Sequence, residues 1–502
     1  MSPDLHQLAA RKLGIDTHSE TVVFLRKDSV ICRSEGFTSH NRILLTSLNG
    51  QVIATLYQVE GKFLSRNEAG LSDSTWQLLG LREGDTIRAQ HAPAVDSLSQ
   101  MRRRVFGQRL DADAIHHIIG DMVAGRYSAI EIAAFITACT ATPLSVEEIV
   151  PLTQAMVSNG ERLRWNSPVI ADKHSVGGLP GNRTTPIIVA ICAALGLVIP
   201  KTSSRAITSP AGTADTMETL APVTLDKGTI RAVVEKEGGC IAWGGAVALS
   251  PADDILIRIE RALDIDSEGQ MIASILSKKI AAGVTHLVID MPIGPTAKVR
   301  TLEAAEALEK GLVEVAGTFG MRLRIVRGDG SQPIGRGIGP ALEARDVLAV
   351  LQCKPDAPTD LRERALILAG ALLELAGKTP EEQGKAEAAR ALDDGRAWSK
   401  FQRICAAQGG MREPITADHH RTLTAPQAGT VTAMDNRRIS RLAKLAGAPE
   451  DKAAGVELHV HIGDSVAPGS PLCTVQAGSE GGLDYALNYA AANADLFRIT
   501  PS

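Results

Sequence analysis

The stretch Val169-Ile-Ala-Asp-Lys-His-Ser-Val-Gly-Gly-Leu-Pro-Gly-Asn182 decides the fold of the central part of the chain. A short apolar run leads into a loop with three glycines, and the helical run from Thr184 to Leu195 follows. The sequence therefore predicts a strand, a loop and a helix. Glycines let a backbone approach an oxyanion, and free amides at a helix N-terminus attract one. Because Lys173 and Ser175 add a positive charge and a hydroxyl, this loop is predicted to bind phosphate.

The glycine-rich loop does not match the common nucleotide-binding motifs. No Gly-Lys-Ser/Thr closes it, as in a Walker loop, and it lacks the glycine spacing of a dinucleotide fingerprint. ATP and NAD are therefore disfavoured as ligands. A glycine-rich turn of this kind also occurs as a purely structural connection, so the phosphate interpretation needs independent support.

A second donor-rich loop follows the apolar run from Leu197 to Ile199. The segment reads Lys201-Thr-Ser-Ser-Arg-Ala-Ile-Thr-Ser-Pro-Ala-Gly-Thr-Ala-Asp215 and contains six hydroxyls, an arginine and a lysine. We name residues 202–213 the hydroxyl loop. A hydrophilic surface loop is the alternative interpretation. Two donor-rich loops at successive strand ends fit a phosphate site at the carboxyl edge of a parallel sheet.

A third patch, residues 264–279, is predicted to be helical and places Ser274 and Lys278 four residues apart on one face. This pair is able to clamp a planar base, although such pairs more often form a solvated face. Asp266 precedes the helical run and is either a functional acid or the cap of the helix.

The remaining sequence divides into parts of different character. Apolar runs at Cys240–Trp243 and Leu287–Ile289 are separated by helix-length segments, which predicts an α/β domain. Residues 89–104 run polar and end in three arginines, so we expect a solvated boundary there. Thr379 is predicted to cap a further helix. The predicted domains are an N-terminal β-rich domain at 1–88, a helical domain at 105–165 with 252–282 returning to it, an α/β phosphate-binding domain at 166–345, and a C-terminal α+β domain at 346–502.

Composition narrows the class of protein. The 502 residues carry a formal net charge of -4, which leaves no excess basicity to hold nucleic acid. The seven cysteines are scattered and include no CxxC pair, which argues against disulfides and a zinc site. The N-terminal sequence does not resemble a signal peptide, and no apolar stretch reaches about 18 residues. We therefore expect a soluble cytoplasmic protein with no membrane association, no metal and no organic cofactor.

The three patches together resemble the thymidine and pyrimidine-nucleoside phosphorylase family, over about residues 90–500. The blocks Asp172-Lys-His-Ser-x-Gly-Gly178, Ser203-x-Arg205 with Gly212-Thr213, and Ala273-Ser-Ile-Leu-x-Lys-Lys279 occur in family order and at family-like separations. The likeness is strongest to the longer branch, which has an extra N-terminal domain and includes the AMP phosphorylases. The resemblance implies a type II nucleoside phosphorylase fold, an α/β domain plus a helical domain, in a homodimer or larger homo-oligomer.

The resemblance also implies roles for individual residues. Inorganic phosphate is expected on Lys173, Ser175, Thr184, Ser203 and Thr213. Base recognition falls on Ser274 and Lys278, and His174 is expected beside the sugar and the base. Either Asp266 or His174 would be the proton donor. The nucleotide-binding set of the longer branch maps onto Gly178, Ser204, Arg205, Ala206, Ile207, Thr208, Ser209, Thr213 and Lys298.

Two departures leave the substrate open between a nucleoside and a nucleoside 5′-monophosphate. Where the shorter thymidine enzymes have a Gly-His sequence, residues 206–211 read Ala-Ile-Thr-Ser-Pro-Ala, and their extra hydroxyls would suit a second phosphate. Arg258 and Arg261 straddle the position of the arginine that contacts the base in those enzymes. The base and the sugar therefore stay unassigned.

Two rival functions are retained. One is a phosphoribosyltransferase of the anthranilate type, which shares a glycine-rich loop but whose pyrophosphate substrate needs magnesium; Asp253-Asp254 is the only acid pair considered for that metal. The other is a non-catalytic nucleotide-binding protein that uses its C-terminal β module, which faintly resembles lipoyl-type domains, for interactions.

Overall fold

The computed structural model describes residues 7–206, 209–265 and 267–501, in two compact units, Met1–Thr142 and Pro143–Ser502. Ile207, Thr208 and Asp266 lie outside the described residues. Within the described part of the chain, no helix combines the length and the apolar character that crossing a membrane requires.

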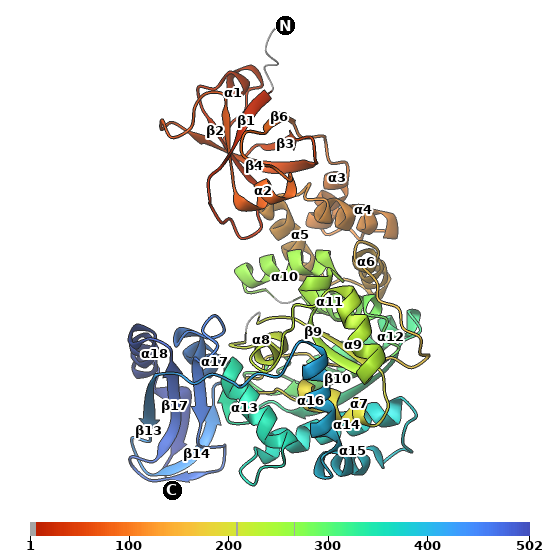
Figure 1. Ribbon diagram of the computed structural model, residues 1–502, viewed down its shortest axis with the longest axis vertical. Coiled ribbons are helices and arrows are strands. Elements are labelled where there is room, and N and C mark those ends of the chain that lie inside the picture. The colour runs from red at the N-terminus through yellow and green to blue at the C-terminus, as the bar shows by residue number, and fades with distance from the viewer. Residues whose placement is uncertain (1–6, 207–208, 266, 502) are drawn as a thin grey trace. The chain divides into compact units, whose positions relative to one another are not determined.

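The first unit contains a closed six-stranded barrel with strand order β1-β5-β2-β4-β3-β6 (Figure 1). Alternate residues point inward, as Ile43 and Leu45 do on β3, because successive strand side chains face opposite sides. The elements of the barrel are β1 Gln7–Lys12, β2 Val22–Arg26, α1 Val30–Ser34, β3 Arg42–Thr46, β4 Gln51–Val59, β5 Glu68–Leu71, α2 Asp73–Leu78 and β6 Thr86–His91.

Helices complete the first unit, and one of them lies where the sequence predicted a polar boundary. The polar boundary expected at 89–104 is wrong, since β6 runs to His91 and α3 occupies most of the remainder. Arg104 is buried and donates a hydrogen bond to the carbonyl of Thr142. The charged run is thus the last turn of a helix and not a linker, with Arg104 buried and Arg102 and Arg103 exposed. The helices are α3 Ser97–Val105, α4 Ala112–Val123 and α5 Ala129–Ala141.

The centre of the second unit is a parallel sheet. One part has the order β11-β10-β7, the other is β8-β9, and a parallel bridge between Ile170 and Val198 joins them. All four apolar runs predicted as strands lie in or directly before these strands. Their bounds are β7 Ala171–Ser175, β8 Ile199–Ser203, β9 Gly239–Trp243, β10 His286–Ile293 and β11 Arg322–Asp329.

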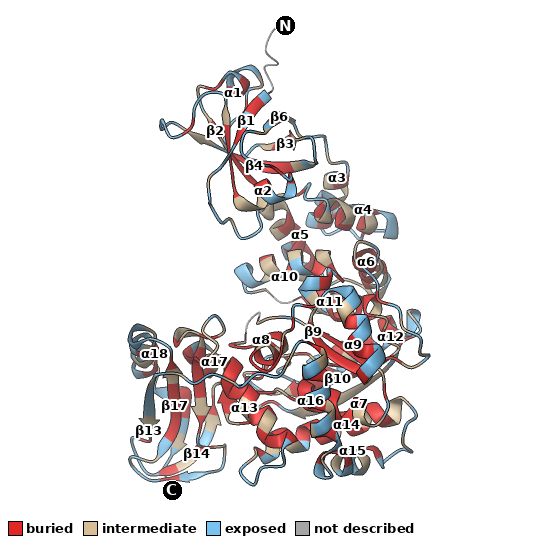
Figure 2. Cartoon of the chain, viewed as in Figure 1, coloured by how far each residue is buried: buried red, intermediate tan, exposed pale blue. Residues whose placement is uncertain are grey.

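Helices cover this sheet, and α7 and β10 are buried over nearly all of their length (Figure 2). The predicted cap at Thr379 is wrong, because α15 begins at Gly384 and Gln383 precedes it. The bounds are α6 Val146–Ser158, α7 Thr185–Ala194, α8 Thr213–Glu218, α9 Lys227–Glu237, α10 Pro251–Leu263, α11 Glu268–Ala281, α12 Leu302–Thr318, α13 Pro340–Leu351, α14 Thr359–Leu375, α15 Gly384–Asp393 and α16 Arg396–Ala407, with a 3₁₀ turn at Gly244–Val247.

The C-terminal layer has a separate core. The core around the parallel sheet continues through α14, α15 and α16, so the predicted boundary at 345 does not coincide with the break between the two cores. The layer contains the sheets β12-β15-β17-β13 and β16-β14-β18. Its elements are β12 Gly337–Ile338, β13 His419–Thr424, β14 Gly429–Met434, α17 Asn436–Leu445, β15 Gly455–Leu458, β16 Ser465–Val466, β17 Pro471–Ala477, α18 Glu480–Ala492, a 3₁₀ turn at Ala494–Leu496 and β18 Phe497–Thr500.

Candidate functional site

The glycine-rich loop between β7 and α7 has the backbone conformation that its sequence predicts. Gly177, Gly178 and Gly181 all have positive φ, at 96°, 82° and 75°. A Cβ at Gly178 would collide with the backbone of Lys298, so the two predicted nucleotide-binding residues are direct neighbours. Only glycine allows both this conformation and this approach.

A buried ion cluster lies beside the loop, on one face of β7. Lys173 Nζ donates a hydrogen bond to Thr184 Oγ1 at 2.9 Å and lies 3.3 Å from Asp290 Oδ2. Arg364 Nε donates to Asp290 Oδ1 at 3.0 Å, and Asn182 Nδ2 donates to Oδ2 at 2.8 Å. The lysine and Asp290 are 1% and 0% exposed. We name Lys173, Asp290 and Arg364 the first cluster.

A second cluster lies around the preceding residue of the strand, whose side chain points to the opposite face. Asp172 receives Lys201 Nζ at 3.2 Å and Lys279 Nζ at 2.7 Å. All three side chains are buried. Lys201 Nζ also donates to the carbonyl oxygen of Lys173 at 2.7 Å, which links the two clusters.

Each cluster places two basic side chains around one carboxylate, so the first carries one surplus positive charge when Lys173 is protonated and the second when Lys201 is protonated. Burial alone would raise the pKa of Asp290, but Lys173 and Arg364 outweigh it and lower that pKa, so the carboxylate is ionised. Burial lowers the pKa of Lys201 to about 7, against the attraction of Asp172, and Lys279 adds to the decrease. Burial also lowers the pKa of Lys173, although Asp290 opposes the decrease. A phosphate anion bound beside these lysines would favour their protonated forms.

Two predicted phosphate ligands have hydroxyls with no hydrogen-bond partner in the described structure. Ser175 is the last residue of β7, and Ser203 is the last residue of β8. The parallel bridge between Ile170 and Val198 joins the two strands, so both serines lie at the carboxyl ends of neighbouring strands. Both Oγ atoms are buried and unpartnered. Because buried hydroxyls are normally hydrogen-bonded, this pair is suited to donate to a bound oxyanion.

The two predicted threonines have their acceptor side occupied. Thr184 Oγ1 accepts from Lys173, and Thr213 Oγ1 accepts from Arg183 Nη1 at 2.8 Å. A hydroxyl that accepts from a cation keeps its own proton to donate. Arg183 is held in turn by Glu343 Oε2, at 2.7 Å from its Nε. Both threonines are therefore oriented as donors.

The predicted base-binding pair forms on α11. Lys278 Nζ donates to Ser274 Oγ at 3.2 Å and to Asp253 Oδ2 at 2.6 Å. Asp253 lies in the first turn of α10 and is buried. The sequence interpretation of Asp253 as part of a magnesium pair is less favourable in this arrangement, since its carboxylate already binds an ammonium group.

The pKa of His174 is affected by lysines of both the predicted phosphate site and the predicted base-binding site. Burial, and then the charges of Lys279, Lys201 and Lys278, hold its pKa well below the ordinary value of 6.5. The imidazole is therefore neutral at pH 7. It is suited to give a hydrogen bond, whereas it is a weak candidate for a stored acidic proton.

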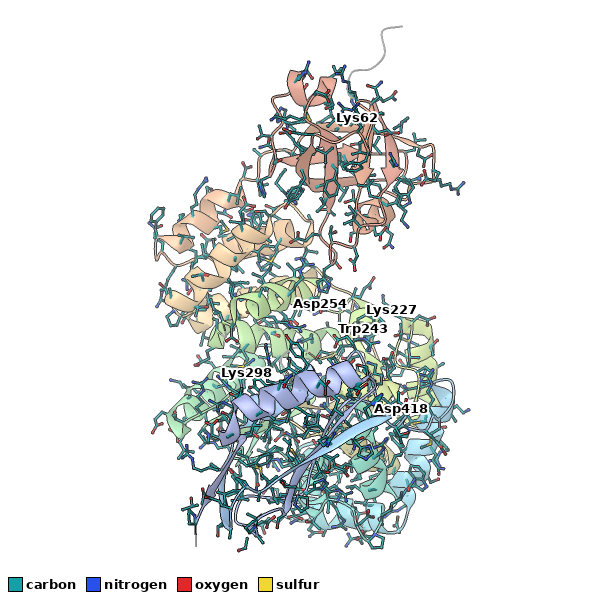
Figure 3. The ribbon with its side chains drawn as sticks, turned by 90° about the vertical axis from the view of Figure 1, so that its left-hand side faces the viewer. Lys62, Lys227, Trp243, Asp254, Lys298 and Asp418 are labelled. Carbon is teal, nitrogen blue, oxygen red and sulfur yellow. The ribbon has the colours of Figure 1, made fainter. Side chains whose placement is uncertain are left out.

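The side chain of Arg205 is bound by other residues of this chain that the sequence did not indicate. Its guanidinium donates to Glu218 at 2.7 and 2.8 Å and to Asp215 at 3.0 Å, and it lies 4.9 Å above the ring of Trp243. Figure 3 labels this tryptophan, the last residue of β9. With the guanidinium so occupied, a direct contact of Arg205 with substrate is not favoured.

The other predicted binding residues of the hydroxyl loop differ in exposure. Ser204 is exposed, and Ser209 Oγ donates to the carbonyl of Ala211 at 2.8 Å. Ile207, Thr208 and the predicted proton donor Asp266 fall outside the described residues. On α10, Arg258 is half-buried and Arg261 is exposed, and which of them contacts a base stays a prediction.

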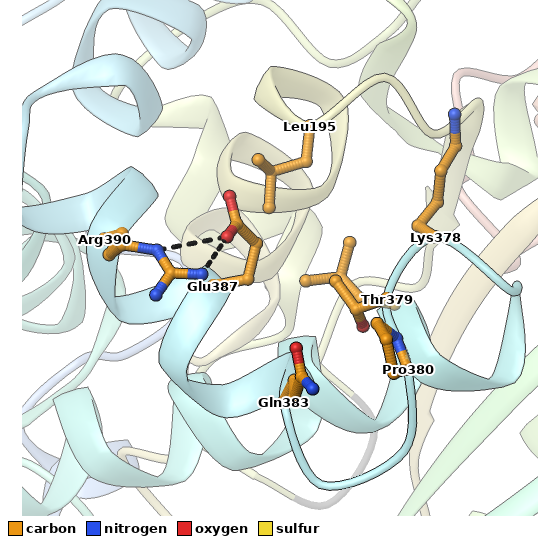
Figure 4. Close-up of a pocket in the computed structure, with 8 residues that line it drawn as sticks. Leu195, Lys378, Thr379, Pro380, Gln383, Glu387 and Arg390 are labelled. Carbon is orange, nitrogen blue, oxygen red and sulfur yellow. Dashed lines mark hydrogen bonds and ion pairs between the residues drawn. The ribbon is translucent and has the colours of Figure 1, made fainter.

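A surface hollow of about 280 Å³ lies away from these residues (Figure 4). It is lined by Leu195 at the end of α7 and by Lys378, Thr379 and Gln383, among others. Thr184 precedes the opposite end of α7, and a helix of 10 residues is about 15 Å long. The hollow is therefore not part of the candidate phosphate site.

Comparisons with known proteins agree with this architecture. The model of the glycosyl transferase family a/b domain matches residues 167–398, and that of its helical bundle domain matches residues 98–160. The model of the pyrimidine nucleoside phosphorylase C-terminal domain matches residues 430–496. A Sphingopyxis alaskensis protein named "Putative thymidine phosphorylase" is 57% identical over 496 residues, which is 99% of this chain and 96% of that protein. The chain belongs to the thymidine and pyrimidine-nucleoside phosphorylase family.

Other relatives and solved structures fit this family assignment. A protein of the same name from a Chelativorans species is 57% identical over 99% of this chain and 98% of its own length. Anthranilate phosphoribosyltransferase from Saccharomyces cerevisiae, solved with PRPP and Mg, has a TM-score of 0.52 at 16% identity and covers 62% of this chain and 98% of its own. The enzyme from Thermus thermophilus has a TM-score of 0.50 at 20% identity, over 61% of this chain and 98% of its own. These two structures share their fold with the part of this chain that they cover.

Sequence reasoning missed the residues that hold Lys173 in place. Asp290 interrupts the apolar run of β10, and a lone acid within such a run signals a buried ion pair. Arg364 and Arg183 gave no comparable signal, because their partners are distant in the sequence. The candidate site therefore contains more ionic support than its motifs indicate.

Proposed function

We propose that this phosphorylase uses inorganic phosphate to cleave the N-glycosidic bond of a nucleoside or of a nucleoside 5′-monophosphate. The observation that carries the proposal is the pair of Ser175 and Ser203 hydroxyls, which have no partner among the described residues and lie at neighbouring strand ends beside two buried clusters of basic side chains. Such an arrangement is electrostatically incomplete until a multivalent oxyanion binds. Family membership supports the same reaction class.

In the proposed mechanism, a phosphate oxygen attacks C1′ of the pentose. The bond between C1′ and the base nitrogen breaks, and its electron pair leaves with the base. The positive charge that develops on the sugar is stabilised by the phosphate oxygens, which Lys173 and the surrounding hydroxyls hold in position. Ser274 and Lys278 are proposed to hold the base, where the ammonium group would offset the developing negative charge.

Either Asp266 or His174 is proposed to supply the proton that the base receives. Burial and the neighbouring lysines hold the pKa of His174 well below its usual value, so its ring is neutral at pH 7 and is suited to donate an N–H hydrogen bond to the sugar or the base. Asp266 would need a raised pKa to hold a proton at that pH, because an ordinary aspartic acid is ionised there.

The proposal is tested by incubating the purified protein with inorganic phosphate and, separately, with thymidine, uridine, AMP, CMP and UMP, while release of free base is followed. Release from thymidine or uridine would assign the nucleoside reaction. Release only from monophosphates would assign formation of ribose 1,5-bisphosphate. If no phosphate-dependent release occurs from any of the five, the proposal is wrong for these substrates.

The two serines give a prediction that separates binding from folding. Ser175→Ala and Ser203→Ala are each expected to raise the KM for phosphate about tenfold, since each removes one hydrogen bond to an anion. The free energy of unfolding is expected to stay equal or to rise slightly, because a partnerless buried hydroxyl is lost. Phosphate titrations and urea denaturation measure the two quantities.

Ser72→Ala is the matched control for these variants. Ser72 is also buried, but its hydroxyl accepts from the amide of Thr75 as a helix cap. We expect this change to cost about 1 kcal/mol of stability and to leave the KM for phosphate unchanged. Equal stability losses in all three variants would contradict the assignment of Ser175 and Ser203 as phosphate ligands.

A further inference from the structure

One carboxylate closes the hydroxyl loop. Asp215 lies in the first turn of α8 and is buried. Its Oδ2 accepts hydrogen bonds from the backbone amides of Ala206, at 2.7 Å, and Gly212, at 3.0 Å. A single oxygen atom therefore joins two backbone positions of the loop that are six residues apart. The position of Asp215 therefore sets the distance between the backbone amides of Ala206 and Gly212.

The other oxygen of Asp215 is held from outside the loop. Its Oδ1 accepts from Arg205 Nη1 at 3.0 Å and from Lys452 Nζ at 3.2 Å. Lys452 belongs to the C-terminal layer, in the segment between α17 and β15, and its Nζ also lies 3.3 Å from Glu218 Oε2. The carbonyl of Lys452 accepts from the amide of Ala341 at 3.0 Å, which ties this segment to α13. The C-terminal layer thus contributes a side chain to the support of the loop.

The four charges at this point are balanced. Arg205 and Lys452 face Asp215 and Glu218. Without Lys452, the carboxylates of Asp215 and Glu218 would share the guanidinium of Arg205. Oδ1 of Asp215, the oxygen that does not bind the loop amides, would lose one of its two donors. Like charges at short range repel, and Asp215 is too deeply buried for water to screen it well. The hydrogen bonds to Ala206 and Gly212 would weaken as Asp215 shifts.

We propose that Lys452 is a positioning residue, through which the C-terminal layer fixes Ala206 and Gly212 of the hydroxyl loop for binding of the nucleoside or nucleotide. The identity of the ligand that binds the loop rests on the proposed function. The ion pairs that join Lys452 to Asp215 and Glu218, which we call the ionic tie, do not depend on it. The phosphate ligands Lys173 and Ser175 lie on β7, and the hydroxyl of Thr213, which follows Gly212, is held separately by Arg183. The KM for phosphate should therefore change less than the KM for the nucleoside or nucleotide when Lys452 is lost.

The tie is tested first without catalysis, by hydrogen exchange of peptides that contain the amides of Ala206 and Gly212. In Lys452→Met these amides are expected to exchange about tenfold faster than in the unmodified protein, and Lys452→Arg should restore most of the protection. Lys400→Met is the control, because Lys400 joins α16 to Glu237 at 3.2 Å and has no ion pair or hydrogen bond with the described residues of the loop. Unchanged exchange in Lys452→Met would overturn the proposal.

Kinetics then separate positioning from a general loss of stability. With the nucleoside or nucleotide that the unmodified enzyme cleaves, Lys452→Met should raise the KM for that substrate at least fivefold, while the KM for phosphate and kcat stay within about twofold. Lys452→Arg should fall within threefold of the unmodified enzyme. An equal rise in both KM values, or no rise, would overturn the positioning role. If the unmodified protein cleaves none of the five substrates, the proposed function is wrong. The hydrogen-exchange experiment then still tests whether Lys452 stabilises the amides of Ala206 and Gly212.

Discussion

Lys173→Met is expected to lower kcat/KM for phosphorolysis by about 10³-fold, comparable to the loss of a key electrostatic donor in other active sites. Lys173 is the buried cation next to the glycine-rich loop, and it also orients the hydroxyl of Thr184. Methionine retains much of the side-chain volume but removes the charge and the donor. The surplus charge of the first cluster then disappears, and with it the reason for an anion to bind there.

The same substitution is expected to have a modest effect on folding. Without Lys173, Asp290 still faces Arg364 and Asn182, so the carboxylate keeps a cation and a hydrogen-bond donor. We expect a loss of less than about 2 kcal/mol in the free energy of unfolding. Base release at saturating and limiting phosphate, together with urea denaturation, measures both effects.

Lys227→Met is the control for the lysine substitution. Lys227 pairs with Glu161 on the surface, where ion pairs contribute little. We expect unchanged kinetics and stability for this variant. If Lys173→Met retained kcat/KM within tenfold of the unmodified enzyme, the placement of phosphate beside the first cluster would be wrong.

Local patterns predicted the parts of the site that lie at strand ends. The apolar runs before Lys173 and Lys201 are short and end in polar residues, so both the strands and the loops after them could be located. Ser175 and Ser203 followed directly, because parallel strands end at the same edge of a sheet. The pairing of Ser274 with Lys278 was equally local, being set by the helical repeat.

Long-range packing determined the parts that could not be predicted. Asp290 and Arg364 are 74 positions apart and reach the first cluster from β10 and α14. A sequence shows that an arginine is present but not which carboxylate it meets. The partners of Arg205 could not be predicted for the same reason, since Glu218 and Trp243 reach its guanidinium from outside the loop.

Asp290→Ala is expected to have the largest effect on stability, a loss of about 3–5 kcal/mol in the free energy of unfolding. Asp290 is 0% exposed and receives both Lys173 and Arg364. Its removal leaves two buried cations with no carboxylate between them, whereas loss of either cation leaves a balanced pair. Urea denaturation of Asp290→Ala, Lys173→Met and Arg364→Met should therefore rank the aspartate far above the lysine.

The double variant Asp290→Ala with Arg364→Met decides whether charge is the cause. It removes one of the two orphaned cations, so it should be more stable than the sum of the two single losses predicts, by about 1–3 kcal/mol. Additive losses would mean that Asp290 acts through packing and not through charge. Activity should be absent in both variants, because Lys173 then loses the carboxylate that positions its ammonium group for phosphate. The residue that matters most for stability is thus one that need not touch a substrate.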